Sequence, residues 1–217
     1  MEIKVLRNVL EANDAVAAEN RQLLAASGTY AVNFIASPGA GKTTLLERTI
    51  DGLKDEFRIG VVEGDIAGSV DAERIARHEV PVVQINTGGD CHLNAPTVRN
   101  ALEGLPLREL QLLFIENVGN LVCPAGFDLG ENAKVVVLSV AEGDDKPEKY
   151  PLIFERSAAM VLNKIDLLSM VDFDMDRARS KARVSHPDLP IFELSARTGQ
   201  GLVAWLEWLR RVTRQTA

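Results

Sequence analysis

The order of apolar and polar positions along the chain predicts alternating strands and helices. Short apolar runs that suit buried strands are separated by segments whose apolar residues recur at helical spacing. Strands are expected at residues 30–36, 57–65, 80–86, 110–117, 134–142, 158–166 and 189–196. Helices are expected at residues 41–54, 69–78, 95–103, 148–156, 173–184 and 201–215. This alternation predicts an α/β fold with a mostly parallel sheet of about seven strands flanked by helices.

An additional helix is expected before the first strand, over residues 4–26. Its apolar stripe consists of Leu6, Val9, Leu10, Val16, Ala17, Leu23 and Leu24. Asn13 and Asn20 fall on the same stripe and interrupt it. The stripe indicates a helix that packs on the edge of the sheet, and a partner-docking arm is the alternative.

Composition restricts the class of protein. The length of 217 residues suits one domain, so we treat residues 1–217 as a single domain with an N-terminal helix. The net charge of −7 and the lack of a basic block argue against nonspecific nucleic-acid binding. No apolar run reaches membrane-spanning length and no signal peptide is recognised. With only two cysteines, a cytoplasmic location is expected.

The segment FIASPGAGKTT, residues 34–44, has the strand–loop–helix context of a phosphate-binding P-loop. Gly39 and Gly41 allow backbone amides to face phosphates, and the Lys42 side chain can reach the β- and γ-phosphates. Ala36 replaces the first glycine of the motif, and we expect it to end the strand with a negative φ, which alanine tolerates. The expected nucleotide contacts are Gly39, Ala40, Gly41, Lys42, Thr43 and Thr44.

Acidic residues at two strand ends predict a magnesium site beside this loop. Asp65 and Glu116 end strands whose tips should face the phosphates, and Mg²⁺ prefers oxygen ligands. With the Thr43 hydroxyl they form the expected Mg²⁺ site. Lys42 and Asp65 are the catalytic candidates, Asp65 for positioning the attacking water. Since no arginine finger is evident near the phosphates, slow intrinsic hydrolysis is expected.

A second, independent motif indicates guanine recognition. NKID, residues 163–166, follows an apolar strand and has the N-K-x-D form. The Asp166 carboxylate can accept hydrogen bonds from guanine N1–H and its amino group, while Asn163 and the Lys164 stem contact the base. Ser195 and Ala196, in ELSART, fit the element that contacts the base through a backbone amide. The order of the motifs favours GTP over ATP.

Three soft ligands suggest a separate metal site. Cys91 and His92 lie in one loop and Cys123 in another, each after a predicted strand. Thiolate and imidazole suit Zn²⁺ or Ni²⁺. On these residues alone the motif is weak, and incidental free thiols are the alternative.

Several sequence blocks together resemble the hydrogenase nickel-incorporation GTPases, the HypB family, over about residues 8–212. The blocks are SPGAGKTTLL, EGDIAGSVDAERI, TGGDCHLNA, FIENVGNLVCPA, EGDDKPEKYP and LNKIDLL. The resemblance implies a P-loop protein of the nucleotide-dependent dimerising class, which hydrolyses GTP to GDP and phosphate and delivers Ni²⁺ to a hydrogenase. It also implies that Asp65 and Glu116 lie at the Mg²⁺ site and that Cys91, His92 and Cys123 bind Ni²⁺ or Zn²⁺.

The implied partners are a second copy of the chain, the hydrogenase large-subunit precursor and a nickel-transferring maturation protein. Because one chain offers three soft ligands, a two-fold dimer could complete a shared tetrahedral site. Glu116 and Cys123 lie seven residues apart in one segment. We therefore expect GTP to change metal affinity, and metal to change GTP affinity by the same factor.

The chain departs from the family pattern at three places. Ala36 stands where glycine is usual, and Gly68 where threonine is usual. Many members carry a Cys-x-x-Cys or histidine-rich nickel-storage tract near the N-terminus, and residues 1–30 contain no cysteine and no histidine. We therefore expect a form without that storage motif.

Two other functions remain open at this stage. A urease-type nickel GTPase shares the P-loop but carries a Cys-Pro-His metal motif, whereas this chain has Cys-His-Leu and a second cysteine at position 123. A GTP-regulated binding switch that carries no metal would leave both cysteines incidental.

Overall fold

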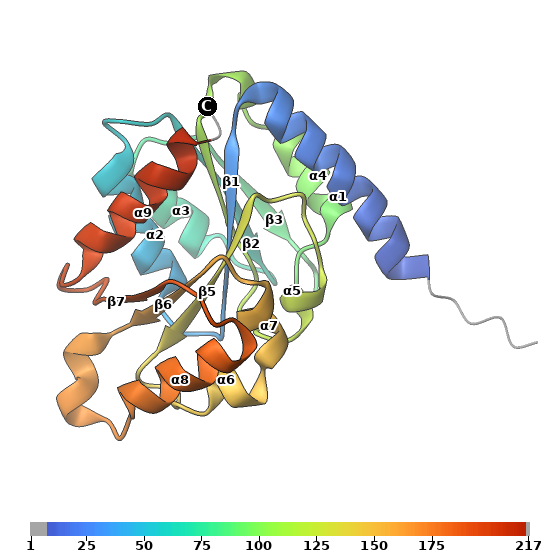
Figure 1. Cartoon of the computed structure of the whole chain (residues 1–217). Helices are drawn as coiled ribbons and strands as arrows, with labels where there is room; N and C mark the ends of the chain where they lie inside the picture. Colours follow the sequence, from blue (N-terminus) through green and yellow to red (C-terminus); the bar gives the residue numbers. More distant parts are fainter. Residues whose placement is uncertain (1–7, 216–217) are drawn as a thin grey trace, which may run out of the picture.

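The computed structural model describes residues 8–215 and confirms the alternation of strands and helices. All seven strands of the described chain join one sheet of order β3-β2-β4-β1-β5-β6-β7, and every neighbouring pair is parallel (Figure 1). The strands are β1 (Tyr30–Ala36), β2 (Ile59–Asp65), β3 (Val82–Asn86), β4 (Leu112–Glu116), β5 (Ala133–Ser139), β6 (Ala159–Asn163) and β7 (Ile191–Glu193). The carboxyl ends of all strands therefore lie at one edge, where α/β proteins bind ligands.

Helices cover both faces of this sheet. The α-helices are α1 (Asn8–Ser27), α2 (Lys42–Leu53), α3 (Val70–Ala76), α4 (Ala95–Glu103), α5 (Cys123–Gly126), α6 (Lys146–Lys149), α7 (Pro151–Arg156), α8 (Met175–Ser185) and α9 (Leu202–Arg214). Short 3₁₀ turns occur at η1 (Leu107–Glu109) and η2 (Ile165–Met170). In the described part of the chain, no helix is long and apolar enough to cross a membrane.

The core has one layer on each side of the sheet. Helices α2, α3 and α9 pack on one face, over side chains such as Phe34 and Phe114. Helices α1 and α4 cover part of the opposite face, and α5, α7 and α8 cover the rest (Figure 1). Because both faces are buried, the strands read as nearly continuous apolar runs.

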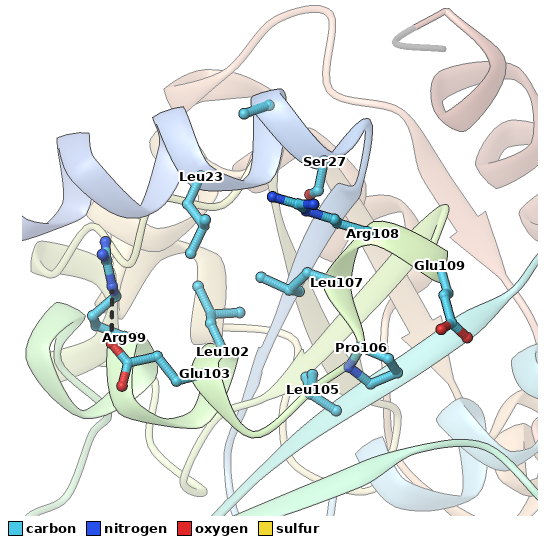
Figure 2. Close-up of a pocket in the computed structure, with 11 residues that line it drawn as sticks. Leu23, Ser27, Arg99, Leu102, Glu103, Leu105, Pro106, Leu107, Arg108 and Glu109 are labelled. Carbon is cyan, nitrogen blue, oxygen red and sulfur yellow. Dashed lines mark ion pairs between the residues drawn. The ribbon is translucent and has the colours of Figure 1, made fainter.

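The N-terminal helix packs on a face of the sheet, so the prediction that it packs on the sheet edge is wrong. Leu24 of α1 is buried in a cluster with Ala31 of β1 and Leu113 of β4, two central strands. Figure 2 shows Leu23 of α1 directed toward Leu102 of α4, in a recess of about 490 Å³ between α1, α4 and η1. Helix α1 begins at Asn8 in the structure, and the start of the predicted helix at residue 4 lies outside the described residues.

Two segments differ from the predicted elements for local reasons. The loop predicted after β4 contains a one-turn helix, α5, which starts at Cys123 and has Pro124 in its first turn. The helix predicted at 148–156 is instead two short helices, α6 and α7, which meet at Tyr150. Pro151 opens α7, where a residue without an N–H is tolerated but cannot continue the preceding helix.

Ala36 behaves as expected for the altered first position of the P-loop. It is the last residue of β1 and is fully buried. Outside glycine, the only positive φ angles in the described chain belong to Glu79 and Lys164, so the predicted negative φ of Ala36 is confirmed. Alanine therefore fits this position without backbone strain.

Trp205 of α9 anchors the face that carries the P-loop strand. It is fully buried, packs edge-on against Phe34, and its Nε1 donates to Thr49 Oγ1 at 2.9 Å. We expect Trp205→Ala to lower the free energy of unfolding by about 3–5 kcal/mol, because it leaves a cavity and removes this hydrogen bond. Urea unfolding followed by circular dichroism measures the loss. Val203→Ala, at a 67% exposed position of the same helix, is the control and should change stability by less than about 0.5 kcal/mol; equal losses would contradict the assignment.

Candidate functional site

The carboxyl ends of β1, β2 and β4 surround a polar pocket of about 520 Å³. The P-loop, the end of β2, helix α3 and the segment after β4 form its walls. The lining residues are Pro38, Gly39, Gly41, Lys42, Thr43, Thr44, Glu63, Gly64, Asp65, Ile66, Asp71, Arg74, Glu116, Asn117, Val118, Gly119 and Lys164. The structure thus brings together the predicted phosphate-binding loop and both predicted acids.

The P-loop has the backbone geometry that a phosphate cradle requires. Gly39 and Gly41 have φ angles of 76° and 95°, which L side chains rarely adopt. A Cβ on Gly41 would also lie 2.7 Å from Asn163 Nδ2. Lys42 and Thr43 begin α2 and are nearly buried, so the helix N-terminus adds partial positive charge beside the lysine.

Three acids meet beside Thr43, and two of them were not in the predicted set. Thr43 Oγ1 donates to Glu116 Oε1 at 2.8 Å. Carboxylate oxygens of Glu63, Asp71 and Glu116 lie within 4.8 Å of one another. Glu63 and Glu116 are both about 2% exposed, and the Oε2 atom of each has no hydrogen-bond partner among the described residues. Such unpaired buried acceptors, next to a hydroxyl, match the oxygen ligands of Mg²⁺.

Burial sets the protonation of these carboxyls. Loss of solvent, reinforced by the neighbouring Glu116, raises the pKa of Glu63 to about 10. Loss of solvent also raises the pKa of Glu116 to about 7, against the opposing effects of Lys42 and the Thr43 hydrogen bond. A divalent cation at this position would favour the charged forms.

Asp65 lines the pocket but its carboxylate is already engaged. Oδ1 accepts from the Ile66 amide at 2.6 Å and Oδ2 from the Gly68 amide at 3.0 Å. A Cβ on Gly68 would lie 2.5 Å from Asp65 Oδ2, so a larger residue here would require this carboxylate to shift. In this arrangement Glu63 and Asp71, rather than Asp65, lie beside Glu116. The sequence feature that could have indicated this role of Glu63 is its position as a glutamate inside the apolar run of β2, two residues before Asp65.

Arg74 is a second residue that the sequence analysis missed, since no arginine was expected near the phosphates. It lies on α3 and lines the pocket. Its guanidinium donates to Thr44 Oγ1 at 3.1 Å and is held by Glu47 at 2.6 Å and Asp71 at 3.0 Å. No local motif marks this residue, because its approach depends on how α3 packs against α2.

A buried amide organises the predicted base-binding corner. Asn163 is 1% exposed, and its Nδ2 donates to the Ala40 carbonyl at 3.0 Å. Its Oδ1 accepts from the amides of Lys164 and Ala196, at 2.8 and 3.0 Å. The amide therefore joins the P-loop, NKID and ELSART. Lys164, at φ 64°, donates from Nζ to the Gly39 carbonyl at 2.6 Å.

The two remaining base-site residues lie in the same corner. Asp166 Oδ1 is buried without a hydrogen-bond partner within residues 8–215, as expected of an acceptor kept for a ligand donor. Ser195 is fully buried, and its Oγ accepts from the Thr198 amide at 3.1 Å, which shapes the loop that presents Ala196.

The structure also brings together the three soft ligands. Cys91, His92 and Cys123 each offer an atom within 4.8 Å of the others, and both thiols are free. The His92 ring lies against Phe127 with centroids 4.0 Å apart, and burial lowers the pKa of His92, which favours the neutral imidazole that binds metal. The hydrogen-bonded Cys123 thiol raises the pKa of Cys91.

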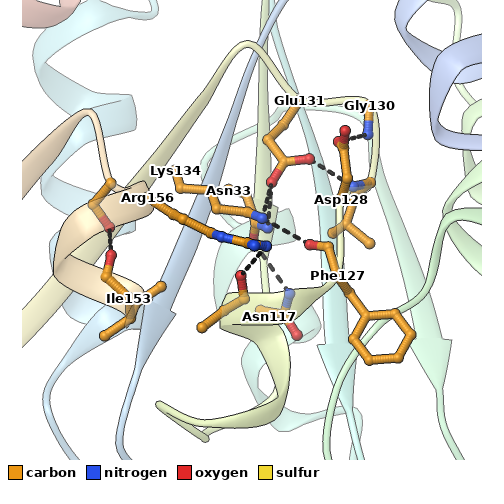
Figure 3. Close-up of polar contacts among 12 residues, drawn as sticks. Asn33, Asn117, Phe127, Asp128, Gly130, Glu131, Lys134, Ile153 and Arg156 are labelled. Carbon is orange, nitrogen blue, oxygen red and sulfur yellow. Dashed lines mark hydrogen bonds and ion pairs between the residues drawn. The ribbon is translucent and has the colours of Figure 1, made fainter. Parts of the chain in front are cut away.

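This cluster is tied to the acidic pocket through the residue after Glu116. Asn117 is 1% exposed, and its Oδ1 accepts from the Leu93 amide, next to His92, at 3.0 Å. Its Nδ2 donates to Asn33 Oδ1 at 3.3 Å, and Asn33 donates to Glu131 (Figure 3). The two candidate sites therefore share one hydrogen-bonded segment at the end of β4.

The other two histidines lie apart from these clusters. His78 Nδ1 is 2.8 Å from Asp51 Oδ1, and His186 Nδ1 is 3.1 Å from the Ser157 carbonyl oxygen. His78 lies just after α3 and His186 caps the end of α8, and both side chains are half-buried.

Comparison with known proteins agrees with this geometry. The model of the CobW/HypB/UreG nucleotide-binding domain matches residues 31–193. The hydrogenase maturation factor HypB of Rhizobium leguminosarum bv. viciae is 52% identical over 207 residues, which cover 95% of this chain and 69% of that protein. A probable hydrogenase maturation factor HypB of Methanocaldococcus jannaschii is 43% identical, over 98% of this chain and 96% of that protein.

Solved structures give the same result. HypB from Helicobacter pylori, in a complex with nickel, matches with a TM-score of 0.89 and 38% identity, covering 94% of this chain and 96% of that one. HypB from Archaeoglobus fulgidus matches with a TM-score of 0.88 and 41% identity, covering 94% of this chain and 100% of that one. The chain therefore belongs to the CobW/HypB/UreG family of nucleotide-binding domains, and within that family to the HypB proteins.

Proposed function

We propose that this protein is a GTP-hydrolysing metallochaperone that delivers nickel during the maturation of nickel-iron hydrogenase. The observation that carries the proposal is the position of the soft-ligand cluster, Cys91, His92 and Cys123, on segments adjoining the nucleotide pocket. The identity to hydrogenase maturation factors and to a nickel-bound HypB supports the same assignment.

GTP is the nucleotide in this proposal. The phosphates lie on the amides of residues 39–44 and on the Lys42 side chain. The Asp166 carboxylate reads guanine N1–H and the amino group, while Asn163 and Ser195 hold the surrounding loops and Ala196 offers its backbone. Adenine lacks these donors in this pattern, so it would leave the Asp166 acceptor unpaired.

The residues beside Thr43 fit a magnesium ion. Thr43 and Glu116 would hold it, with Glu63 or Asp71 as a further ligand, and Asp65 at the pocket wall would be an additional candidate. When bound, Mg²⁺ neutralises charge on the phosphate oxygens. Lys42 would stabilise charge that develops on the γ-phosphate. Asp65 lines the pocket and would position the attacking water once its carboxylate is released from the Ile66 and Gly68 amides. Arg74 is held by Glu47 and Asp71, so we expect intrinsic GTP hydrolysis to be slow.

Nickel is the cargo of the second site, which can also bind Zn²⁺. Cys91, His92 and Cys123 supply three ligands, and the same set from a second copy would complete a shared site in a GTP-dependent homodimer. A nickel-transferring maturation protein and the hydrogenase large-subunit precursor are the proposed partners. Both thiols are free, which fits the reducing cytoplasm.

The two alternative functions are less well supported. A urease-type nickel GTPase would carry a Cys-Pro-His motif, and this chain has Cys-His-Leu instead. A binding switch that carries no metal would not need three soft ligand atoms within 4.8 Å of one another.

Asp166→Asn tests base recognition. An amide at this position offers a donor where guanine also has a donor, so GTP affinity should fall by roughly 10- to 100-fold. Xanthosine triphosphate has a carbonyl in place of the guanine amino group and should gain affinity. Calorimetric titration with both nucleotides measures the exchange. Asp172→Asn, in the loop after η2, is the matched control. An Asp166 variant that binds GTP normally would contradict the guanine assignment.

Cys91→Ala tests the cargo site. We expect the high-affinity Ni²⁺ site to be lost while GTP affinity is retained, because Cys91 does not line the nucleotide pocket. Competition with a chelator, with and without a non-hydrolysable GTP analogue and Mg²⁺, measures both the site and its coupling to nucleotide. His78→Ala, which removes an imidazole outside the cluster, should bind Ni²⁺ like the wild type. If Cys91→Ala also binds like the wild type, the metallochaperone proposal is wrong.

Glu63→Gln tests the cost of the buried carboxyls in the metal-free protein. The folded pKa of about 10 lies above the ordinary value of 4.5, so stability falls as pH rises through this window. At pH 8 the variant should unfold with a free energy about 1–3 kcal/mol higher than the wild type, and this difference should shrink toward pH 5. Urea unfolding at both pH values checks it, with Glu11→Gln on the exposed face of α1 as control. An unchanged or lower stability at pH 8 would contradict a pKa of Glu63 raised by burial.

A further inference from the structure

Helix α1 buries two amide side chains on the face that packs against the protein body. Asn13 is 4% exposed and Asn20 is fully buried, and they alternate with Ala17 and Leu24 on the same face. Burying an amide costs free energy unless it is hydrogen-bonded, and apolar residues would pack here at lower cost. The two interruptions of the apolar stripe therefore indicate a specific polar role.

Both asparagines bridge the same two segments. Asn13 Oδ1 accepts from the Ala95 amide and its Nδ2 donates to the Asp128 carbonyl, each at 2.8 Å. Asn20 Nδ2 donates to the carbonyls of Ala95 and Leu129, each at 3.0 Å. Helix α1 thus joins the start of α4 to the loop that follows α5.

These two segments carry the soft-ligand cluster. Ala95 lies three residues after His92, and Asp128 directly follows Phe127, whose ring lies against His92. Cys123 begins α5, which leads into the same loop. The separation of the two segments therefore sets how His92 approaches Cys123.

Other contacts hold the bridged segments in place. Arg21 of α1 forms an ion pair with Asp128 at 2.7 Å, and a Cβ on Gly130 would lie 2.6 Å from the Ala17 carbonyl oxygen. On the sheet side, Lys134 Nζ donates to the Phe127 carbonyl at 2.8 Å and Glu131 accepts from the Leu129 amide at 2.7 Å (Figure 3). The loop is thus fixed between α1 and the sheet.

We propose that Asn13 and Asn20 are positioning residues for the metal site formed by Cys91, His92 and Cys123. The inference rests on the proposed nickel function and extends it to α1, which supplies no residue to the soft-ligand cluster or to the lining of the nucleotide pocket. Without the hydrogen bonds of Asn13 and Asn20, the two segments can separate, and the three ligand atoms no longer converge on one metal position. By linkage, metal binding must in turn stabilise the docked position of α1.

Ni²⁺ titration against a competing chelator tests this role, with the full wild-type chain compared with the variants Asn13→Leu and Asn20→Leu. Leucine has a branched shape similar to that of asparagine but cannot form the bridging hydrogen bonds. We expect Ni²⁺ affinity to fall roughly tenfold, in the range seen for groups that orient metal ligands. The thiolate-to-nickel absorption band at saturating Ni²⁺ should shift, and GTP affinity should stay unchanged. Affinity and spectrum equal to those of the wild type would overturn the proposal.

Leu24→Ala is the matched control, because it weakens packing on the same buried face and its side chain makes none of these hydrogen bonds. It should lower stability and leave Ni²⁺ affinity and spectrum intact. An equal loss of affinity in Leu24→Ala would assign the effect to general loosening and overturn the specific role. Failure of the wild type to bind Ni²⁺, or normal binding by Cys91→Ala, would instead overturn the proposed function itself.

Hydrogen exchange of the wild type gives a test that needs no variant. Added Ni²⁺ should slow amide exchange in α1 around residues 13–24, and GTP-free protein should be used so that nucleotide binding does not contribute. Unchanged exchange in α1 at saturating Ni²⁺ would overturn the proposal.

Discussion

The arrangement of this protein depends on two neighbouring buried side chains at the end of β4. In the acidic pocket, Glu116 accepts a hydrogen bond from the Thr43 hydroxyl. Beside the soft-ligand cluster, Asn117 accepts a hydrogen bond from the Leu93 amide. Because successive residues of a strand point to opposite faces, one short segment serves both sides of the sheet. A shift of this strand end would move both sets of contacts together, which gives the two sites a common mechanical element.

The same strand end shows how the fold trades stability for chemistry. Two carboxyls that are about 2% exposed, each with an oxygen lacking a partner in the described chain, are expensive to keep in a protein interior. Their cost is offset by the surrounding parallel sheet, whose faces are both covered by apolar layers. Rigid packing around an unfavourable cluster is the arrangement expected where a cation, rather than the protein, completes the coordination.

Features encoded by adjacent residues could be predicted from the sequence, and features that depend on packing could not. The P-loop, NKID and the alternation of strands and helices along the chain are local patterns. The range 30–36 predicted for the first strand matches β1. Glu63, Asp71 and Arg74 come from β2 and α3, and only tertiary packing places them beside Thr43 and Glu116. The face-on packing of α1 was missed because an apolar stripe shows that a helix is buried, and not which surface buries it.

The contact between Gly41 and Asn163 has a consequence for how this protein can diverge. An added Cβ at Gly41 would meet the Asn163 carboxamide, which also accepts from the Lys164 and Ala196 amides. The P-loop and the loops proposed to read the base are therefore in direct contact. A substitution at Gly41 or at Asn163 disturbs both the P-loop and the NKID and ELSART loops. We therefore expect residues of this corner to change only in concert, with the residues on both sides of the contact replaced together.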